Sequence, residues 1–253
     1  MRQDSVAMAE LLEGKLLRVW PSVSTTLREG WAIRLAHGYS GRSNSASALV
    51  PGSRLPPALL DEIEATYRVA GQASQFRLSP LATADAGQIL AGRGYRALNE
   101  ALTMTALLQP PKMQDAIAEL VIETTPSPAW LSGVTGLNDD PSKRRPEHLH
   151  AIVSRFTIPA AFATISLDQQ AAGFGLLAVD DGWAELGSII LAPQARGKGL
   201  GRKLVTGLLG WSQSVGARQA FLQVDATNDV AISLYRSLGF SPVYRYQTMR
   251  RIE

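Results

Sequence analysis

The sequence of 253 residues predicts an α/β protein, of the α+β kind, built from two similar domains. Three observations lead to this prediction. Alternating apolar runs between residues 160 and 191 are joined by tight turns, as in an antiparallel meander. A glycine-rich turn then separates a strand from a helix. Finally, the chain aligns with itself at an offset of 145 residues. We therefore expect each domain to hold a mixed, mostly antiparallel sheet flanked by helices.

The offset pairs positions of the same structural kind. Gly71 falls on Gly216 and Gly94 on Gly239, and each of these glycines follows an expected helix. Apolar and aromatic pairs at the same offset are Leu59 with Leu204, Ile63 with Leu208, Phe76 with Phe221 and Tyr95 with Phe240. We interpret this as an internal duplication, with a boundary after Gln109-Pro110-Pro111 and a short connecting segment at 113–120. The expected domains are residues 1–112 and 113–253.

The elements of the second half follow from periodicity and from helix-start and helix-stop residues. Gly216 and Gly239 each end a helix, and Thr227 or Asn228 caps the helix between them. The second copy starts at 121–123. In order, we then expect helices at 130–134 and 146–156, strands at 160–166, 171–179 and 183–191, a helix at 200–215, a strand at 218–224, a helix from about 228 to 238, and a strand at 240–250.

The segment Arg196-Gly-Lys-Gly-Leu-Gly201 opens the helix at 200–215. Backbone N–H groups at a helix start have no partner within the helix and carry the positive end of its dipole. Glycines remove the Cβ atoms that would keep a phosphate away from those donors. The segment therefore predicts a pyrophosphate-binding turn. A Walker loop is excluded, because Arg202-Lys203 follows the last glycine, and the spacing does not fit a dinucleotide-binding turn.

The first copy has lost this turn. At the 145-residue offset Gly199 corresponds to Arg54 and Gly201 to Pro56, and only Gly52 still matches Gly197. A proline and a side chain stand where a phosphate would need open backbone. We expect the N-terminal domain to be structural or substrate-shaping. Its polar cluster at 42–45 either lines a substrate pocket or closes a turn, and we favour the turn.

Composition excludes several classes of protein and site. Cysteine is absent, so disulfides, zinc–thiolate sites and cysteine nucleophiles are excluded. No metal site is expected from His37, His148 and His150, and we expect the last two in a solvated loop. The net charge is only +3, and the basic cluster at 143–145 lacks aromatic neighbours, which disfavours nucleic-acid binding. We see no membrane-spanning run or signal peptide and expect a cytoplasmic protein.

Three elements resemble the GCN5-related N-acetyltransferase (GNAT) superfamily. They are the strand followed by Ala192-Pro193, the turn at 196–201, and the pattern Asn228-x-x-Ala231-x-x-x-Tyr235-x-x-x-Gly239-Phe240. The resemblance covers residues 121–253, and the first half resembles the same fold over residues 59–104 with the loop degraded. It implies a tandem arrangement in which 1–112 is a degenerate GNAT-like domain and 113–253 is the catalytic one.

The resemblance implies acetyl coenzyme A as cosubstrate. The turn would hold its pyrophosphate, the backbone of the preceding strand would pair with its pantetheine arm, and the strands at 186–191 and 218–224 would splay where the thioester enters. A backbone N–H near Leu191 could serve as an oxyanion site. The residues implied to contact acetyl coenzyme A are Ile189, Ile190, Leu191, Arg196, Gly197, Lys198, Gly199, Leu200, Gly201, Asn228, Ala231 and Tyr235.

Direct attack of a primary amine on the thioester requires the amine to lose a proton first. Tyr235 would protonate or hydrogen-bond the departing thiolate, unless its ring only packs within the helix. Glu185 is the candidate base, and its alternative is a solvent-facing strand residue. Ser188 and Ser233 are given no role.

The expected function is acetyl transfer from acetyl coenzyme A to an amine of a small molecule, a peptide or a protein. Two alternatives remain open: a non-catalytic acyl-coenzyme A-binding sensor or interaction protein, and transfer of a different acyl chain. The acceptor amine is the expected partner, with no membrane partner, and the formation of a homodimer is left open.

Overall fold

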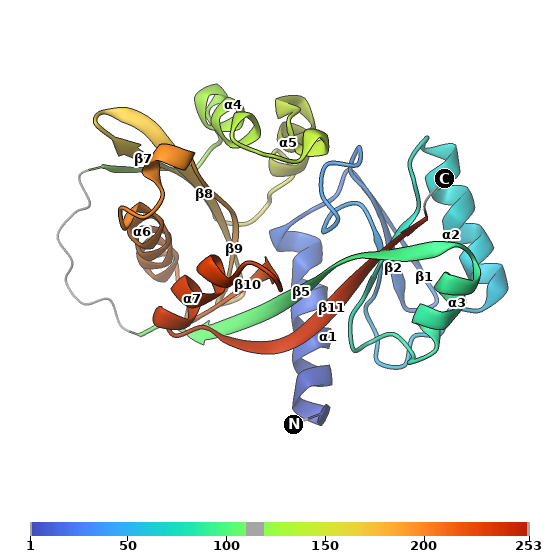
Figure 1. Cartoon of the computed structure of the whole chain (residues 1–253). Coiled ribbons are helices and arrows are strands. Elements are labelled where there is room, and N and C mark those ends of the chain that lie inside the picture. The colour runs from blue at the N-terminus through green and yellow to red at the C-terminus, as the bar shows by residue number, and fades with distance from the viewer. Residues whose placement is uncertain (1, 110–118, 252–253) are drawn as a thin grey trace. The chain divides into compact units, whose positions relative to one another are not determined.

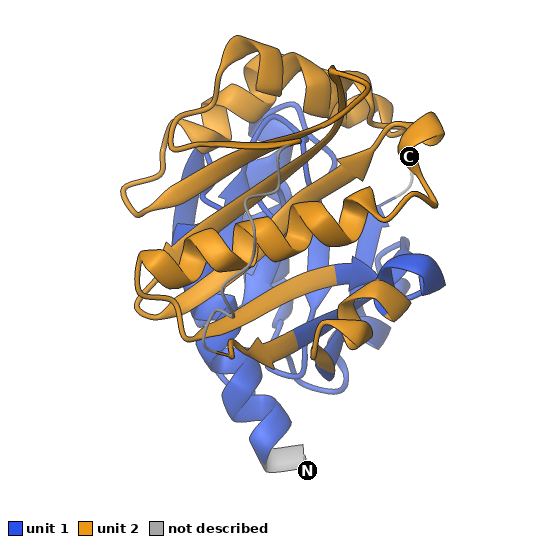
Figure 2. Ribbon diagram, turned by 90° about the vertical axis from the view of Figure 1, so that its left-hand side faces the viewer, with its two compact units in different colours: residues 1–104, 224–232, 242–253 blue, residues 105–223, 233–241 orange. Residues whose placement is uncertain are grey.

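The computed structural model describes residues 2–109 and 119–251 (Figure 1). The expected boundary at 112/113 and residues 113–118 of the connecting segment lie outside this range. Two compact units are coloured separately in Figure 2: the first comprises residues 1–104, 224–232 and 242–253, and the second comprises residues 105–223 and 233–241. Strands β5, β10 and β11 and helix α7 have residues in both units.

The first unit has its strands in the order β1-β2-β3-β4-β11-β5. From β1 to β11, β3 and β4 pair in parallel, and the other neighbours pair antiparallel. Its elements are α1 (Arg2–Val19), β1 (Ser24–Arg28), β2 (Trp31–Leu35), β3 (Ala46–Ala48), α2 (Pro57–Val69), β4 (Gln75–Leu78), α3 (Ala86–Gly92), most of β5 (Tyr95–Leu107) and most of β11 (Ser241–Arg251).

A buried ion pair lies in the core of the first unit. The guanidinium of Arg77 on β4 donates from both terminal nitrogens to the carboxylate of Glu13 on α1, each at 3.2 Å. The hydroxyl of Tyr244 donates to the same carboxylate at 2.9 Å, and the ring of Tyr246 lies 4.1 Å from the guanidinium carbon. Burial alone would lower the pKa of Arg77, but the Glu13 carboxylate outweighs it and the pKa is raised. Arg77 is therefore charged, and its two hydrogen bonds to Glu13 hold α1 on β4.

The second unit has its strands in the order β10-β9-β8-β7-β6. β9 and β10 are parallel, and the remaining neighbours form the expected antiparallel meander. Its elements are β6 (Leu120–Glu123), α4 (Pro128–Gly136), the 3-10 turn η1 (Pro141–Lys143), α5 (Pro146–Val153), β7 (Ala160–Leu167), β8 (Gln170–Asp180), β9 (Trp183–Leu191), the 3-10 turn η2 (Pro193–Ala195), α6 (Leu200–Ser214), most of β10 (Gln219–Asp225) and part of α7 (Asp229–Ser237).

Helices cover both faces of this sheet. A Cβ added at Gly133 of α4 would lie 2.0 Å from the ring of Phe174 on β8, so the ring rests directly on the helix backbone. A Cβ at Gly175, the next residue of β8, would meet Leu204 and Leu208 of α6. Because successive strand residues point to opposite faces, α4 and α6 lie on opposite sides of the sheet. This confirms the expected α/β fold with a mixed sheet flanked by helices.

The two halves of the chain repeat one order of elements at the expected offset. The order strand, turn, helix, strand, helix, strand is found in β3–α2–β4–α3–β5 and again in β9–α6–β10–α7–β11. The three glycine pairs adopt the left-handed conformation in both halves. The φ values are +77° and +74° for Gly52 and Gly197, +65° and +99° for Gly71 and Gly216, and +84° and +91° for Gly94 and Gly239.

Two local expectations need correction, and one is confirmed. The helix expected at 146–156 ends at Val153, and His148 and His150 lie on this helix and not in a loop. The polar cluster at 42–45 does close a turn. Within it the side-chain oxygen of Asn44 accepts the backbone N–H groups of Ala36 (2.7 Å) and Gly38 (3.1 Å).

Candidate functional site

Strands β9 and β10 are paired over the first half of β9 and diverge after it. Their parallel pairing runs from Trp183 opposite Gln219 to Leu186 opposite Leu222 and stops there, although β9 continues to Leu191. Beyond that point the side chains of β9 are only half-buried, while those before it are fully buried. The run at 186–191 is thus not the uniformly buried strand that its apolar sequence suggests, because its pairing with β10 ends at Leu186.

A β-bulge lies where the two strands diverge. On β8, Leu176 faces Gly187 and Phe174 faces Ile190, so β9 carries one residue more than its partner over this stretch. Ser188 adopts the left-handed conformation, with φ of +50°. A bulge bends a strand and increases its twist. Ser188, to which the sequence assigned no role, therefore helps to open the sheet.

The divergent end of β9 leads through η2 into the glycine turn. Gly197 and Gly199 have φ of +74° and +76°, and a Cβ at either position would meet no atom within 4 Å. Gly199 is the N-cap of α6 and provides no side chain to cap the first turn. The turn thus presents open backbone at the positive end of a 15-residue helix.

The cations around the turn divide into two groups. Arg202 donates to the Ser237 hydroxyl at 2.6 Å, and Lys203 forms an exposed ion pair with Glu119 at 3.1 Å. Arg196 and Lys198 are exposed within the turn itself, where Arg196 also donates to the Leu191 carbonyl at 3.3 Å. The turn therefore combines exposed cations with an uncapped helix start, which suits a multiply charged anion such as a pyrophosphate.

Gly201 has a different role from the first two glycines of the turn. A Cβ there would lie 3.4 Å from a Leu191 methyl and 3.6 Å from a Leu234 methyl. Leu200 beside it is buried. The start of α6 at Gly201 therefore packs closely against Leu191 of β9 and Leu234 of α7.

Tyr235 on α7 is buried, and its ring packs against Phe240 with a centroid separation of 5.9 Å. Its backbone carbonyl accepts the N–H groups of Leu238 and Phe240, each at 3.0 Å, which ends the helix. The packing role considered for this residue is therefore present. A chemical role for its hydroxyl remains a prediction.

Asn228 caps α7, as expected: its side-chain oxygen accepts the Ala231 backbone N–H at 3.1 Å. Both residues belong to the first unit, whereas the glycine turn belongs to the second. Their predicted contacts with acetyl coenzyme A remain predictions.

Glu185 is completely buried on β9, opposite Phe221 of β10 and Ala178 of β8. Its alternative interpretation as a solvent-facing strand residue is wrong. Glu185 lies two residues before the strands diverge. Burial of a carboxylate is costly in free energy, which makes this position notable for a residue proposed as a base.

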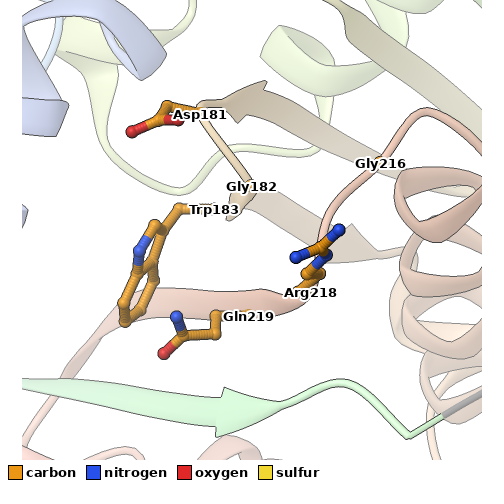
Figure 3. Close-up of a pocket in the computed structure, with 6 residues that line it drawn as sticks. All are labelled: Asp181, Gly182, Trp183, Gly216, Arg218 and Gln219. Carbon is orange, nitrogen blue, oxygen red and sulfur yellow. The ribbon is translucent and has the colours of Figure 1, made fainter.

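A separate cavity of about 440 Å³ lies at the opposite end of β9 and β10, where both strands begin (Figure 3). It is lined by Asp181, Gly182, Trp183, Gly216, Arg218 and Gln219. Because the glycine turn follows the other end of β9, this cavity is not the anion site. Within the described ranges, no group of three or more histidine or acidic side chains could hold a metal ion, and no helix is long and apolar enough to span a membrane.

Residues 11–249 match the family model described as "Probable histone acetyltransferase Rv0428c C-terminal". The chain belongs to this family of GNAT acetyltransferases. This GNAT protein is 28% identical over 229 residues to the uncharacterized N-acetyltransferase YobR of Bacillus subtilis, which covers 88% of this chain and 91% of that protein. The enzyme is accordingly an acyltransferase, and the resemblance drawn from its sequence motifs is confirmed at the level of the family.

Solved structures share the fold of this GNAT protein. A GCN5-related N-acetyltransferase from Kribbella flavida superposes with a TM-score of 0.67 at 18% identity, covering 98% of this chain and 96% of the other. A tandem GNAT protein from the clavulanic acid biosynthesis pathway gives a TM-score of 0.58 at 14% identity, with 81% and 76% covered. At sequence identities this low, the similarity to these structures shows a shared fold only.

Proposed function

We propose that this GNAT protein transfers an acetyl group from acetyl coenzyme A to a primary amine of a small molecule, a peptide or a protein. One observation carries the proposal: the divergence of β9 from β10 leads directly into the open glycine turn of α6. The phosphate-bearing end and the extended arm of one cofactor molecule can thus be held by two adjacent parts of the chain, the glycine turn and the end of β9. We also propose that the protein acts in the cytoplasm.

The turn at 196–201 would bind the pyrophosphate. The unpaired side of β9 at Ile189, Ile190 and Leu191 would pair with the amides of the pantetheine arm, much as a strand is added to a sheet edge. In such an arrangement the thioester would lie near the point of divergence, two residues beyond the buried Glu185.

In the proposed reaction a deprotonated amine attacks the thioester carbonyl. A C–N bond forms, the C–S bond breaks, and the sulfur leaves as a thiolate. Glu185 would accept the amine proton, through water or directly, and Tyr235 would donate a proton or a hydrogen bond to the sulfur. A backbone N–H near Leu191 would stabilise the charge on the carbonyl oxygen.

We further propose that residues 1–112 are a degenerate copy of the catalytic domain 113–253, as in a tandem GNAT protein. The repeated element order and the three left-handed glycine pairs support this. In the first copy the corresponding turn differs: the carbonyl of Arg54 accepts the Trp31 indole N–H at 2.7 Å, and Pro56, which has no backbone N–H, stands at the N-cap of α2. The chain would then have one cofactor site.

Calorimetry with acetyl coenzyme A tests both proposals through one matched pair of variants. Gly197→Val should abolish binding, because the side chain would enter the anion site. Gly52→Val introduces the same side chain at the corresponding left-handed glycine, also with open space around it, so the strain is similar and binding should persist. Equal affinities for both variants would refute the assignment of the turn. Binding without thiol release across an amine panel would instead support the sensor alternative.

A further inference from the structure

Gln223 is a half-buried residue whose side-chain amide is buried and has no partner within the part of the chain that the structure describes. It lies on β10 directly after Leu222, the last residue paired with β9. Both polar atoms of its side chain, Oε1 and Nε2, are buried, and neither has a hydrogen-bond partner among the described residues. It thus stands at the first position where the parallel sheet opens.

Such an arrangement is unfavourable unless something else supplies the missing hydrogen bonds. A buried polar group that lacks a hydrogen bond reduces stability, and native proteins rarely retain one without a functional reason. A carboxamide here presents one acceptor and two donor hydrogens, and it carries no charge at any ordinary pH. The missing partner should therefore contain both a donor and an acceptor.

The side chain also lies on the same face of the sheet as Glu185. Along β10, Gln219, Phe221 and Gln223 alternate with residues that point to the other face. Phe221 is directly opposite Glu185. Gln223 consequently lies on the same face of the sheet as the Glu185 carboxylate, two residues beyond Phe221 toward the point where the strands diverge.

We propose that Gln223 binds the acceptor substrate, an inference that rests on the proposed acetyl transfer. Its Oε1 accepts an N–H of the attacking amine, and its Nε2 donates to an oxygen next to that amine. The acceptors favoured by this geometry are primary amines with a neighbouring neutral oxygen, such as the amino terminus of a peptide or an amino-acid amide. As the proposed base, Glu185 would be ionised before it accepts the amine proton, and a second carboxylate close to it would be disfavoured.

The test measures kcat/KM for two small acceptors with three full-length proteins: the wild type, Gln223→Leu and Gln219→Leu. Alaninamide has the neighbouring oxygen, and isopropylamine lacks it. Gln223→Leu should lower kcat/KM for alaninamide roughly ten- to hundredfold, as expected for two lost hydrogen bonds, and for isopropylamine by a much smaller factor. The Kd for acetyl coenzyme A should not change. Gln219→Leu, on the same face but within the paired region, should leave both acceptors unaffected.

Thermal melting separates this role from a structural one. Because Gln223→Leu removes two buried groups that lack partners, its Tm should equal or exceed that of the wild type. Equal losses for the two amines, or a weakened Kd for acetyl coenzyme A, would overturn the proposal in favour of a general or a cofactor-binding role.

An NMR titration distinguishes failure of this inference from failure of the proposed function. The side-chain amide resonances of Gln223, assigned by their absence in Gln223→Leu, should shift when alaninamide is added in the presence of coenzyme A. A shift without any turnover would retain the binding site and reject acetyl transfer. Turnover of alaninamide without a shift would retain acetyl transfer and reject the role of Gln223.

Discussion

Tyr235 makes two contributions that can be separated by substitution. Its ring packs on Phe240 inside the second unit, and its hydroxyl is the proposed partner of the leaving sulfur. Tyr235→Phe keeps the ring and removes the hydroxyl, so we expect kcat to fall about 100-fold, as for loss of a general acid, while the Kd for acetyl coenzyme A stays constant. Steady-state kinetics and calorimetry measure the two quantities.

Phe240→Leu is the matched control, since it reduces the ring contact and leaves the hydroxyl in place. It should lower Tm with little effect on kcat. If Tyr235→Phe instead reduces kcat and acetyl coenzyme A affinity by the same factor, the residue acts through packing.

Residues in the glycine turn could be predicted from sequence because their signal is local. Left-handed glycines before an apolar helix need no knowledge of the rest of the fold, and both Gly197 and Gly199 adopt that conformation. Ser188 and Gln223 could not be predicted in this way. The bulge at Ser188 and the missing partners of Gln223 depend on where β9 stops pairing with its neighbours, which is a tertiary property.

At the scale of elements, the contact between α4 and β8 depends on the absence of a side chain at Gly133. Gly133→Ala would place a methyl group 2.0 Å from the Phe174 ring, with ring atoms on either side. The ring or the helix must move, and we expect a loss of about 1–3 kcal/mol in the free energy of unfolding. Chemical denaturation of the full-length protein measures this loss.

The same helix supplies the control. A Cβ at Gly136 would meet no atom within 4 Å, and its φ is not in the left-handed region. Gly136→Ala should therefore be neutral or stabilise the protein by roughly 0.5–1 kcal/mol. Similar destabilisation by both variants would show that helix flexibility, and not the Phe174 contact, is what Gly133 provides.

The meander was predictable nearly to the residue, whereas the first sheet was not. Strands β7 to β9 alternate apolar residues between clear turns, and their observed bounds differ by at most one residue from those expected. In the first unit, Arg34 on β2 and Arg77 on β4 are buried charges within strands. A charge at a core position interrupts the apolar pattern from which strands are inferred. The partner of such a charge can also be distant in sequence, as Glu13 is from Arg77.

At the scale of the whole molecule, β11, the last strand in chain order, lies between β4 and β5 in the sheet of the first unit. β11 pairs antiparallel with β4, with Thr248 opposite Arg77 and Met249 opposite Phe76. A fragment of residues 1–112 lacks this strand, together with the Tyr244 hydroxyl that donates to Glu13. We expect the isolated fragment to remain largely unfolded, with poor dispersion in its amide NMR spectrum.

Adding a fragment of residues 119–253 should restore dispersed signals from the first fragment, because it returns β11 to the edge of β4. A well-dispersed spectrum from residues 1–112 alone would contradict this expectation and favour two halves that fold independently.

The duplication could be found by aligning the sequence with itself, but the assignment of strands to units could not. The offset relates β4 to β10 and β5 to β11 by their place in the repeat. It does not say which strand pairs with which, because the two final strands have similar patterns and either could add to either sheet. The division at 112/113 therefore remains a prediction about the copies, while the compact units combine residues from both halves.

The pairing of β4 with β11 also sets an order of events during synthesis. The ribosome releases β4 more than 160 residues before β11, at rates of about 5–20 residues per second. For those seconds, the edge of β4 has no β11 to cover it, and an open strand edge invites association with other chains. The newly made protein would thus need chaperone protection until translation ends, and its yield should depend on how rapidly the C-terminus is delivered.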